Sequence, residues 1–533
     1  MKSFFKRRKT AVRAKQSSGS EDLIPSSLSA NLDTIRQKTG YSPDIIIRTL
    51  SIGHYKAAVV YTDGLIDSVP IQESLLEPLL KHEALPKPLP PDEALPIIAR
   101  QSIALGSIQF TKKYEEAILA VVGGDAVLFM DGTSTAVITD VKGGERRSIQ
   151  EASTQVSVRG PKEGFTESMA TNIALIRRMI HNPNVWVETM KVGKQTKTDV
   201  AVMYINGLVS EEVLGEVRRR LKKINMDGVL ESGYVEQLIE DETFTPFPTI
   251  INTERPDIVT ANLLEGRVAI IVNGTPFVLL APAVFVQFFQ SAEDYYSRFD
   301  IATAIRMLRV LVFLISLIGP AVYIAATTFH QEMIPTGLLI IVAAQRDNVP
   351  FPAFVEALIM EITFEILREA GVRMPKAIGS TVSIVGALVI GQAAVQAGIV
   401  SPAMVIIVSI TAITSFATPS YSIAMSARLL RFLFMGAAAS FGFYGVALIF
   451  MAMIVHLCSL RSFGVPYMSP LAPFIAKNVG DTFIRLPLLF SKNRPRLFGH
   501  SNPTRSERGQ EYDHSVPKGM VNKKTVEGET NET

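Results

Sequence analysis

The hydrophobic positions divide the chain into two parts. As far as about residue 300, apolar residues occur in short runs between charged and turn-forming segments, whereas residues 310–458 contain long uncharged runs. Short runs are typical of strands and helices around a soluble core, and long apolar runs are typical of membrane spans. The pattern therefore predicts an α+β membrane protein, with a cytoplasmic pair of related α/β subdomains followed by an α-helical multi-spanning membrane domain.

Two motifs in the first part recur at a nearly constant offset. The run Ala57–Ile66, AAVVYTDGLI, returns 143 residues later as Val200–Val209, VAVMYINGLV, and Ala126–Thr133, AVLFMDGT, returns 142 residues later as Val268–Thr275, VAIIVNGT. Each first motif is typical of a strand that runs into an Asp-Gly or Asn-Gly turn, and each second motif is typical of a hairpin. Residues 41–290 are therefore predicted to hold a duplicated unit.

The second part contains several candidate membrane segments. Val310–Thr328 is a 19-residue uncharged run, long enough to cross about 30 Å of hydrocarbon. The arginines before it place its start on the cytoplasmic side. The other expected spans are 380–400, 404–425 and 434–458, with 333–345 as a shorter, re-entrant candidate.

The number of spans stays open between four and six. Four spans return the C-terminus to the cytoplasm, where the basic tail belongs, but they place Arg428 and Arg431 outside, against the positive-inside bias. A fifth span at 333–345 moves these arginines inside and sends the basic tail out. We favour cytoplasmic ends.

These patterns predict six regions along the chain. They are a basic flexible arm (1–40), α/β subdomain 1 (41–156), a linker loop and helix (157–199), α/β subdomain 2 (200–300), a helical membrane domain (301–460) and a basic, polar cytoplasmic tail (461–533).

Composition excludes several classes of function. The chain has one cysteine, Cys458, and its seven histidines show no i, i+4 pair, so neither a disulfide framework nor the common zinc pattern is present. We expect no metal, no cofactor and no catalytic residues. The first fifteen residues carry seven Lys/Arg and no acid but no apolar segment follows, so they are not a secretory signal. A basic arm of this kind suits anionic lipid or nucleic acid, but its lack of periodicity favours a solvated flexible tail. We expect membrane lipid, and no nucleic acid, among the partners of the chain.

The stretch Ser157–Glu167, SVRGPKEGFTE, resembles a phosphate-binding loop at first sight. It lacks the G-x-x-x-x-G-K-[ST] spacing that such loops need, and no strand leads into it. Its glycines, Gly160 and Gly164, suit a sharp turn. Its cations, Arg159 and Lys162, and the following Arg177 and Arg178 suit either an anion or, as we favour, ion pairs with Glu163 and Glu167. The loop and these arginines are predicted to take part in assembly, tying the two subdomains or neighbouring protomers together.

Polar residues inside the apolar half are the candidate ion path. Glu361 and Glu365 are one helical turn apart, and they suit either a water-lined vestibule or an interfacial helix with its acids in water. Gln392 and Gln396, and Thr411 and Ser415, should face protein or water, either lining a pore or making hydrogen bonds between or within helices. Gly319-Pro320 in the first span predicts a kink with a gating role.

Several strings resemble the A-subunit family of spore germinant receptors of endospore-forming bacteria. The resemblance covers about residues 30–490. The strings that carry it are Ser157–Glu167, Asn172–Arg178, Pro276-Phe277, Phe285–Phe289, Glu293–Tyr296, Pro335-Thr336, Pro350–Pro352, Glu365–Arg373 and Ile384–Gly386.

The resemblance implies a subunit of a nutrient receptor in the spore inner membrane. Its partners would be a multi-spanning B subunit and a lipoprotein C subunit, and copies of the chain would form the oligomeric ion-conducting part that triggers germination. From the residues alone, a secondary transporter of a small nutrient is the alternative, although transporters normally show repeats among their spans and none is visible here. A phosphate-handling enzyme is a weaker third candidate.

Overall fold

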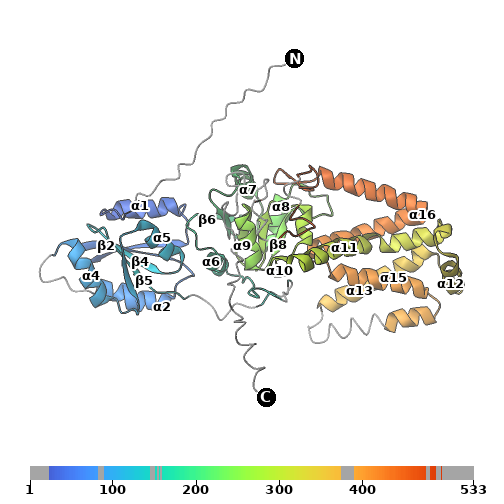
Figure 1. Cartoon of the computed structure of the whole chain (residues 1–533), viewed down its shortest axis with the longest axis horizontal. Coiled ribbons are helices and arrows are strands. Elements are labelled where there is room, and N and C mark those ends of the chain that lie inside the picture. The colour runs from blue at the N-terminus through green and yellow to red at the C-terminus, as the bar shows by residue number, and fades with distance from the viewer. Residues whose placement is uncertain are drawn as a thin grey trace, which may run out of the picture.

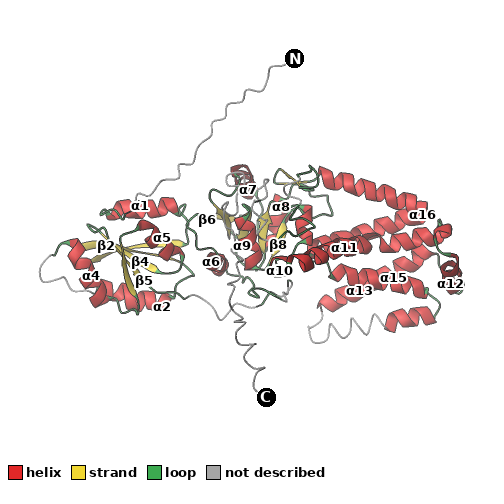
Figure 2. Ribbon diagram, viewed as in Figure 1, coloured by secondary structure: helices red, strands yellow, loops and turns green. Residues whose placement is uncertain are grey.

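The structure is a computed structural model of the chain, and it describes residues 23–81, 89–143, 151–152, 155, 159–373, 389–475, 480–487 and 494. The molecule is elongated. Two units, each built on a β-sheet, lie in a row and a bundle of helices follows them (Figure 1). Strands are confined to the two units and to a short hairpin beside the second one, and the bundle is helical (Figure 2).

The first unit contains a five-stranded sheet in the order β1-β2-β4-β5-β3, in which all neighbours are antiparallel. Helices cover both of its faces, and two apolar clusters separate helices from strands. The strands are β1 Ile45–Ile52, β2 Tyr55–Thr62, β3 Ile108–Thr111, β4 Ala126–Met130 and β5 Ala136–Thr139. The helices are α1 Leu28–Lys38, α2 Ser68–Pro70, the π-turn η1 Ile71–Leu76, α3 Glu77–Leu80, α4 Pro91–Ser102 and α5 Tyr114–Val122.

The second unit repeats this arrangement with the order β6-β7-β9-β10-β8. Its strands are β6 Val185–Val192, β7 Thr198–Ile205, β8 Ile251–Thr253, β9 Val268–Val272 and β10 Val278–Ala281. Its helices are α6 Met169–Met179, α7 Glu211–Lys223, α8 Ser232–Ile239 and α9 Pro256–Leu264, followed by the 3-10 turn η2 Phe285–Phe289 and the short α10 Glu293–Tyr296.

The repeated sequence motifs lie on equivalent strands. The first motif pair forms β2 and β7, and the second pair forms β4 and β9 with the turns that follow them. Every residue of β4 and of β9 is buried, because helices cover both faces of each sheet. Continuous apolar runs, rather than alternating ones, are what two-sided burial requires. The glycines of both hairpin turns, Gly132 and Gly274, have positive φ as these turns demand.

The boundaries between the regions differ from those expected from the sequence. Residues 28–38, expected in a flexible arm, form α1, and the apolar side chains of this helix pack on the first sheet. The region 157–199, expected as a linker, supplies α6 and the edge strand β6 of the second sheet. The tail also contributes, because Phe463 and Val465, in the hairpin of β11 Arg461–Ser462 and β12 Val465–Pro466, join the core of the second unit.

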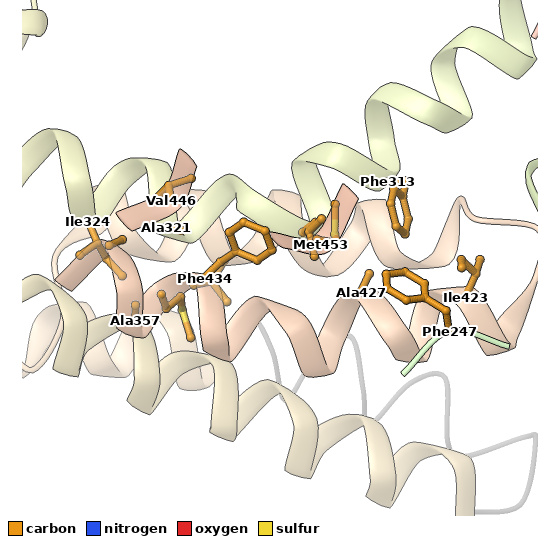
Figure 3. Packing of buried hydrophobic residues seen from close by; sticks show 14 of the residues in the cluster. Phe247, Phe313, Ala321, Ile324, Ala357, Ile423, Ala427, Phe434, Val446 and Met453 are labelled. Carbon is orange, nitrogen blue, oxygen red and sulfur yellow. The ribbon is translucent and has the colours of Figure 1, made fainter. Parts of the chain in front are cut away.

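The helical region packs around one apolar cluster, parts of which are shown in Figure 3. The cluster includes Phe247 from the second unit, so unit and bundle share a core. The elements are α11 Phe299–Thr328, the turn η3 Gln331–Met333, α12 Thr336–Arg346, α13 Ala353–Arg373, a helical stretch at 389–396, α15 Pro402–Phe416 and α16 Tyr421–Ser459.

The element α16 is a hairpin of two helices. Gly442 has φ 61° and ψ −144°, which is not helical. Near one end of α16, the Ser426 hydroxyl donates to the carbonyl oxygen of Pro246, and near the other, His456 Nε2 lies 2.9 Å from the hydroxyl of Thr245. A straight helix would hold Ser426 and His456 about 45 Å apart at 1.5 Å per residue. The chain therefore folds back at Gly442, giving a first arm (421–441) and a second arm (443–459).

Gly442 permits this turn for two reasons. Its positive φ is strained for residues with a Cβ, and a Cβ at this position would lie 2.8 Å from the Cβ of Phe329 and 2.7 Å from a ring carbon of His330. The α11–α12 connection thus packs directly against the turn. This places the turn of α16 at the same end of the bundle as the end of α11.

Contacts between helices define their directions. The start of α13 contacts the start of α15 through Glu356 and Ser401, and the end of α13 contacts the end of α15 through Arg368 and Ser415. These two helices are therefore parallel. The first arm of α16 is antiparallel to both, because its early residue Arg428 meets Glu365 and its later residue Arg431 meets Glu361.

The expected spans match these helices only in part. The expected span Val310–Thr328 lies inside α11. The shorter candidate segment 333–345 largely coincides with α12. The predicted span 404–425 is wrong, since the helix breaks at 417–420 between α15 and α16, and the span 434–458 is interrupted by Gly442. Each break falls at small or polar residues inside a long apolar run. Composition alone does not show where one helix ends and the next begins within such a run. The span 380–400 lies partly outside the described residues.

Candidate functional site

Two buried ion pairs join α13 to the first arm of α16. Arg431 Nη1 donates to Glu361 Oε2 at 2.6 Å, and both side chains are at most 3% exposed. Arg431 also donates to the backbone carbonyl and the hydroxyl of Ser316 on α11. One turn away, Arg428 Nη1 donates to Glu365 Oε2 at 2.9 Å, with the carboxylate about one third exposed. The two pairs tie three helices together inside an apolar bundle.

Two further polar contacts extend this row along α13. The fully buried Glu356 accepts hydrogen bonds from the backbone N–H and the hydroxyl of Ser401, and Arg346 lies 3.4 Å from its other oxygen. At the opposite end, Arg368 donates to the hydroxyl of Ser415 at 2.6 Å. We call Glu356, Glu361, Glu365 and Arg368, with their partners, the α13 charge row.

The structure separates the candidate ion-path residues into two groups. Glu361, Thr411 and Ser415 face the interior of a single chain, and both hydroxyls donate to carbonyls of their own helix. Gln392 and Gln396 are exposed. The interior residues can line an ion path only if the surrounding helices separate. The two glutamines already face outward, where another chain or water can contact them.

Gly319 and Pro320 lie inside α11, which continues as one helix across them. A Cβ on Gly319 would be 3.3 Å from the hydroxyl oxygen of Thr411, so Gly319 marks a close approach of α11 to α15. The gating role of this pair stays a prediction.

The loop that precedes α6 packs against the end of the second unit. Gly160 has φ 128°, and a Cβ there would lie 2.5 Å from the ring of Tyr296. The backbone N–H of Arg159 donates to Glu293 at 3.4 Å, and Lys162 lies 3.6 Å from Glu151, an exposed pair. Gly164 is buried and is not among the described glycines with positive φ. The loop thus docks on α10, immediately before the helical region.

The arginines of α6 connect the two units. Arg177 is fully buried, and its Nε and Nη2 donate to the carboxylate of Asp44 at 2.5 and 3.0 Å, directly before β1 of the first unit. Arg178 donates to the backbone carbonyl of Gly143, also in the first unit. Across the same junction, Trp186 of β6 donates from its indole nitrogen to the carbonyl of Lys38. These contacts place two of the predicted linking residues between the units.

Sequence reasoning missed a third charged cluster, which we call the elbow. Asp294 of α10 is 2% exposed and accepts from Arg306 Nε at 2.9 Å and from Arg309 Nη1 at 2.8 and 2.9 Å, both at the start of α11. Arg306 also donates to Asp481, and Gln290 donates to the backbone carbonyls of Asp481 and Thr482. The elbow binds α10, α11 and the tail segment 480–487 together. In the sequence, the string Glu293–Tyr296 carries only the family resemblance. The arginines that pair with Asp294 lie twelve and fifteen residues later, so no local pattern predicts this pairing.

Burial and hydrogen bonding shift the pKa of several groups in the second unit. Burial raises the pKa of Glu236 on α8 to about 7, although Asn252 donates a hydrogen bond to it. Burial also lowers the pKa of Arg267 to about 10. Hydrogen bonding from Arg219 holds the pKa of Glu216 on α7 down at about 2. None of these groups belongs to a metal-binding cluster, and the described part of the chain brings no three His, Cys, Asp or Glu side chains together for one.

These features define a class of protein in which a duplicated α/β unit is tied by buried ion pairs to a bundle of apolar helices. Among the described residues, α11 and α16, the latter divided into two arms at Gly442, contain stretches long and apolar enough to cross a membrane, and α12 and α15 are shorter apolar helices.

Comparison with known proteins identifies the family. The model of the Bacillus/Clostridium GerA spore germination protein family matches residues 33–497. The chain is 58% identical over 514 residues to spore germination protein KA of Bacillus subtilis (strain 168), covering 96% of this chain and 94% of that protein. It is 42% identical over 474 residues to spore germination protein B1 of the same organism, covering 89% and 97%.

The chain belongs to the GerA family of spore germination proteins, and its role is in spore germination. Among solved structures, it is similar to the N-terminal domain of the A subunit of the Bacillus megaterium spore germinant receptor GerK3. That match is 43% identical, covers 51% of this chain and 100% of that chain, and has a TM-score of 0.40.

Proposed function

We propose that this chain is the A subunit of a nutrient germinant receptor in the spore inner membrane, where copies of it assemble as the ion-conducting part. The observation that carries the proposal is the family match over residues 33–497. A multi-spanning B subunit and a lipoprotein C subunit are the proposed partners. The role is that of a receptor subunit rather than an enzyme.

The proposed membrane domain has six crossings. α11 leads away from the second unit, α13 and α15 return toward it, and the two arms of α16 lead out and back. Because α13 ends near the second unit and 389–396 lies toward the opposite end, where Gly391 approaches Val405, we place one further crossing at the span 380–400 expected from the sequence. An even number of crossings puts both units and the tail on the cytoplasmic side.

This topology resolves the problem posed by Arg428 and Arg431. Ser426 contacts Pro246 of the second unit, so Arg428 lies less than one turn, and Arg431 less than two turns, from the cytoplasmic end of the first arm. Their positions agree with the positive-inside bias. Their partners on α13 remove the cost of an unpaired charge among apolar helices.

The surface of a single chain supports assembly within a membrane. Large apolar side chains are exposed along the bundle, including Ile340, Ile413, Phe416, Met451 and Val455. Exposed apolar patches of this kind are covered by lipid or by other chains. Gln392 and Gln396 share one outward face and are costly in lipid, so we assign that face to a neighbouring copy or to the ion path.

We propose that the α13 charge row holds the closed state. In a single chain Glu361 and Glu365 are bound to arginines and cannot form a free acidic ring. Parting of α13 from the first arm of α16 would release these carboxylates, which would then attract cations and repel anions. The ion pairs would thus set the balance between closed and open arrangements.

Cysteine labelling tests the six-crossing topology. In a Cys458→Ser background, we expect a membrane-impermeant maleimide to label Glu332→Cys and Tyr444→Cys from outside intact cells, since both lie at the far end of the bundle. Phe244→Cys, which is 93% exposed beside the second unit, should react only after the membrane is opened. Protection of Tyr444→Cys from outside, with labelling from the cytoplasmic side, would contradict the hairpin in α16.

A further inference from the structure

A cavity of about 120 Å³ lies where the second unit meets the helical region. Its walls come from β8, α9, η2 and α10 of the second unit. On the side of the bundle, Ser420, the residue immediately before α16, completes the lining. A single water needs only about 10–15 Å³ on the same measure, so the cavity has room for a solute of several heavy atoms.

The lining is dominated by amides and hydroxyls. The amide side chains are Gln155, Asn252, Asn262, Gln287 and Gln290, and hydroxyls come from Thr253, Ser291, Tyr295 and Ser420. Amides and hydroxyls both donate and accept hydrogen bonds, as does each hydroxyl of a ligand. Apolar side chains, among them Phe288, form the rest of the wall. Such a mixture of apolar surface and a few polar groups is typical of small-molecule sites.

Two of these polar groups, the Gln287 amide oxygen and the Ser420 hydroxyl, each lack an expected hydrogen bond among the described residues. The amide nitrogen of Gln287 donates to Asn262 Oδ1 at 2.7 Å, but its buried oxygen has no hydrogen-bond partner among the described residues. Ser420 occupies the N-cap position of α16, yet its side chain accepts no hydrogen bond from the helix. Serine at this position ordinarily caps the helix. An unsatisfied buried oxygen is destabilising, and a hydrogen bond from a bound hydroxyl would offset this cost.

The charge of the lining selects against anions. None of the described lining residues is Lys, Arg or His, and the one acid, Glu265, lies 3.8 Å from Arg267. A carboxylate or phosphate ligand would enter without a cation to pair with it, which is costly in a partly buried site. The site therefore suits a solute without negative charge.

We propose that this cavity binds a small uncharged polyol. Its hydroxyls would meet the amides of β8, α9 and η2 and the hydroxyl of Ser420, so one ligand would contact both the second unit and the start of α16. Gln290 and Tyr295 line the same cavity and belong to the elbow, where they bond to the tail segment 480–487. Occupancy would stiffen the junction between the unit and the bundle.

Saturation-transfer NMR on the full-length chain in nanodiscs tests this site. The ligands are glycerol, erythritol and xylitol at millimolar concentration, with malonate as the anionic comparison. We expect transfer to at least one polyol and none to malonate. Ala261→Leu, which places a larger side chain at the exposed part of the lining on α9, should reduce the signal at least fivefold, and Ser420→Ala should weaken it.

The matched control is Ala30→Leu, an exposed helical alanine on α1 of the first unit, which should leave the polyol signal unchanged. Absence of transfer to all three polyols would overturn the proposal, as would equal transfer in wild type and Ala261→Leu. Stronger transfer to malonate than to the polyols would overturn the assigned ligand class. The measurement needs no germination response, so its failure is distinct from failure of the proposed receptor function.

Discussion

Asp294→Ala is expected to destabilise the chain more than any other single substitution considered. Asp294 is 2% exposed and is the shared carboxylate of Arg306 and Arg309, so its loss leaves two cations short of a partner. Removing one partner of a buried ion pair costs about 3–5 kcal/mol. We expect a fall of at least this size in the free energy of unfolding, with release of the tail segment from the elbow.

The measurement is thermal unfolding of the detergent-solubilised chain, followed by fluorescence of Trp186, the one tryptophan. The matched control is Asp300→Ala, which removes an exposed acid six residues later whose partner is the exposed Arg298. An exposed pair contributes about 0–1 kcal/mol, so the control should unfold near the wild-type temperature. Equal unfolding temperatures for Asp294→Ala and Asp300→Ala would contradict the role given to the elbow.

Glu361→Ala is expected to have the second largest effect. Arg431 is 2% exposed, and without Glu361 its charge would be held only by Ser316 among apolar helices. The expected loss is again about 3–5 kcal/mol, visible as reduced abundance in the membrane and a lower unfolding temperature. The double variant Glu361→Leu with Arg431→Met should recover most of this loss, because it removes both charges and keeps the volume filled.

Glu369→Ala provides the control on the same helix. Glu369 pairs with Arg373 one turn later, and both side chains are well exposed, so this change should cost at most about 0.5 kcal/mol. If Glu361→Ala proved as stable as Glu369→Ala, the buried pair would not hold α13 to α16 in the way the structure indicates. A double variant no better than Glu361→Ala alone would count against the pairing itself.

Local sequence signals predicted the parts of the fold that depend on neighbouring residues. The repeated motifs marked β2 and β7, and β4 and β9, because a buried strand ending in Asp-Gly or Asn-Gly has a recognisable pattern. Asp67 directly follows the first motif, and it accepts a hydrogen bond from the N–H of Val69 at the start of α2, as an N-cap aspartate does. The helix predicted within 157–199 corresponds to α6, whose apolar face packs on the second sheet.

Features that depend on distant residues could not be predicted in this way. The turn at Gly442 lies in an apolar run with no break in hydropathy, and the contact with His330 that requires a glycine comes from a loop over one hundred residues earlier. The partners of Glu361 and Glu365 lie on another helix, so sequence spacing showed two acids on one face but not their arginines. The one sequence feature that indicated the hairpin was the conflict between the positions of Arg428 and Arg431 and the positive-inside bias.

Cation efflux from proteoliposomes tests the central claim most directly, that the helical bundle forms a cation path held closed by the α13 charge row. The variant is Glu365→Gln. Because the Glu365 carboxylate is about one third exposed, its pair with Arg428 contributes about 1 kcal/mol, and loss of the pair should shift the closed state about fivefold toward the open one. We predict potassium efflux through Glu365→Gln about fivefold above wild type at equal protein incorporation, with chloride retained. Efflux no greater than from protein-free liposomes, for both wild type and Glu365→Gln, would contradict the account.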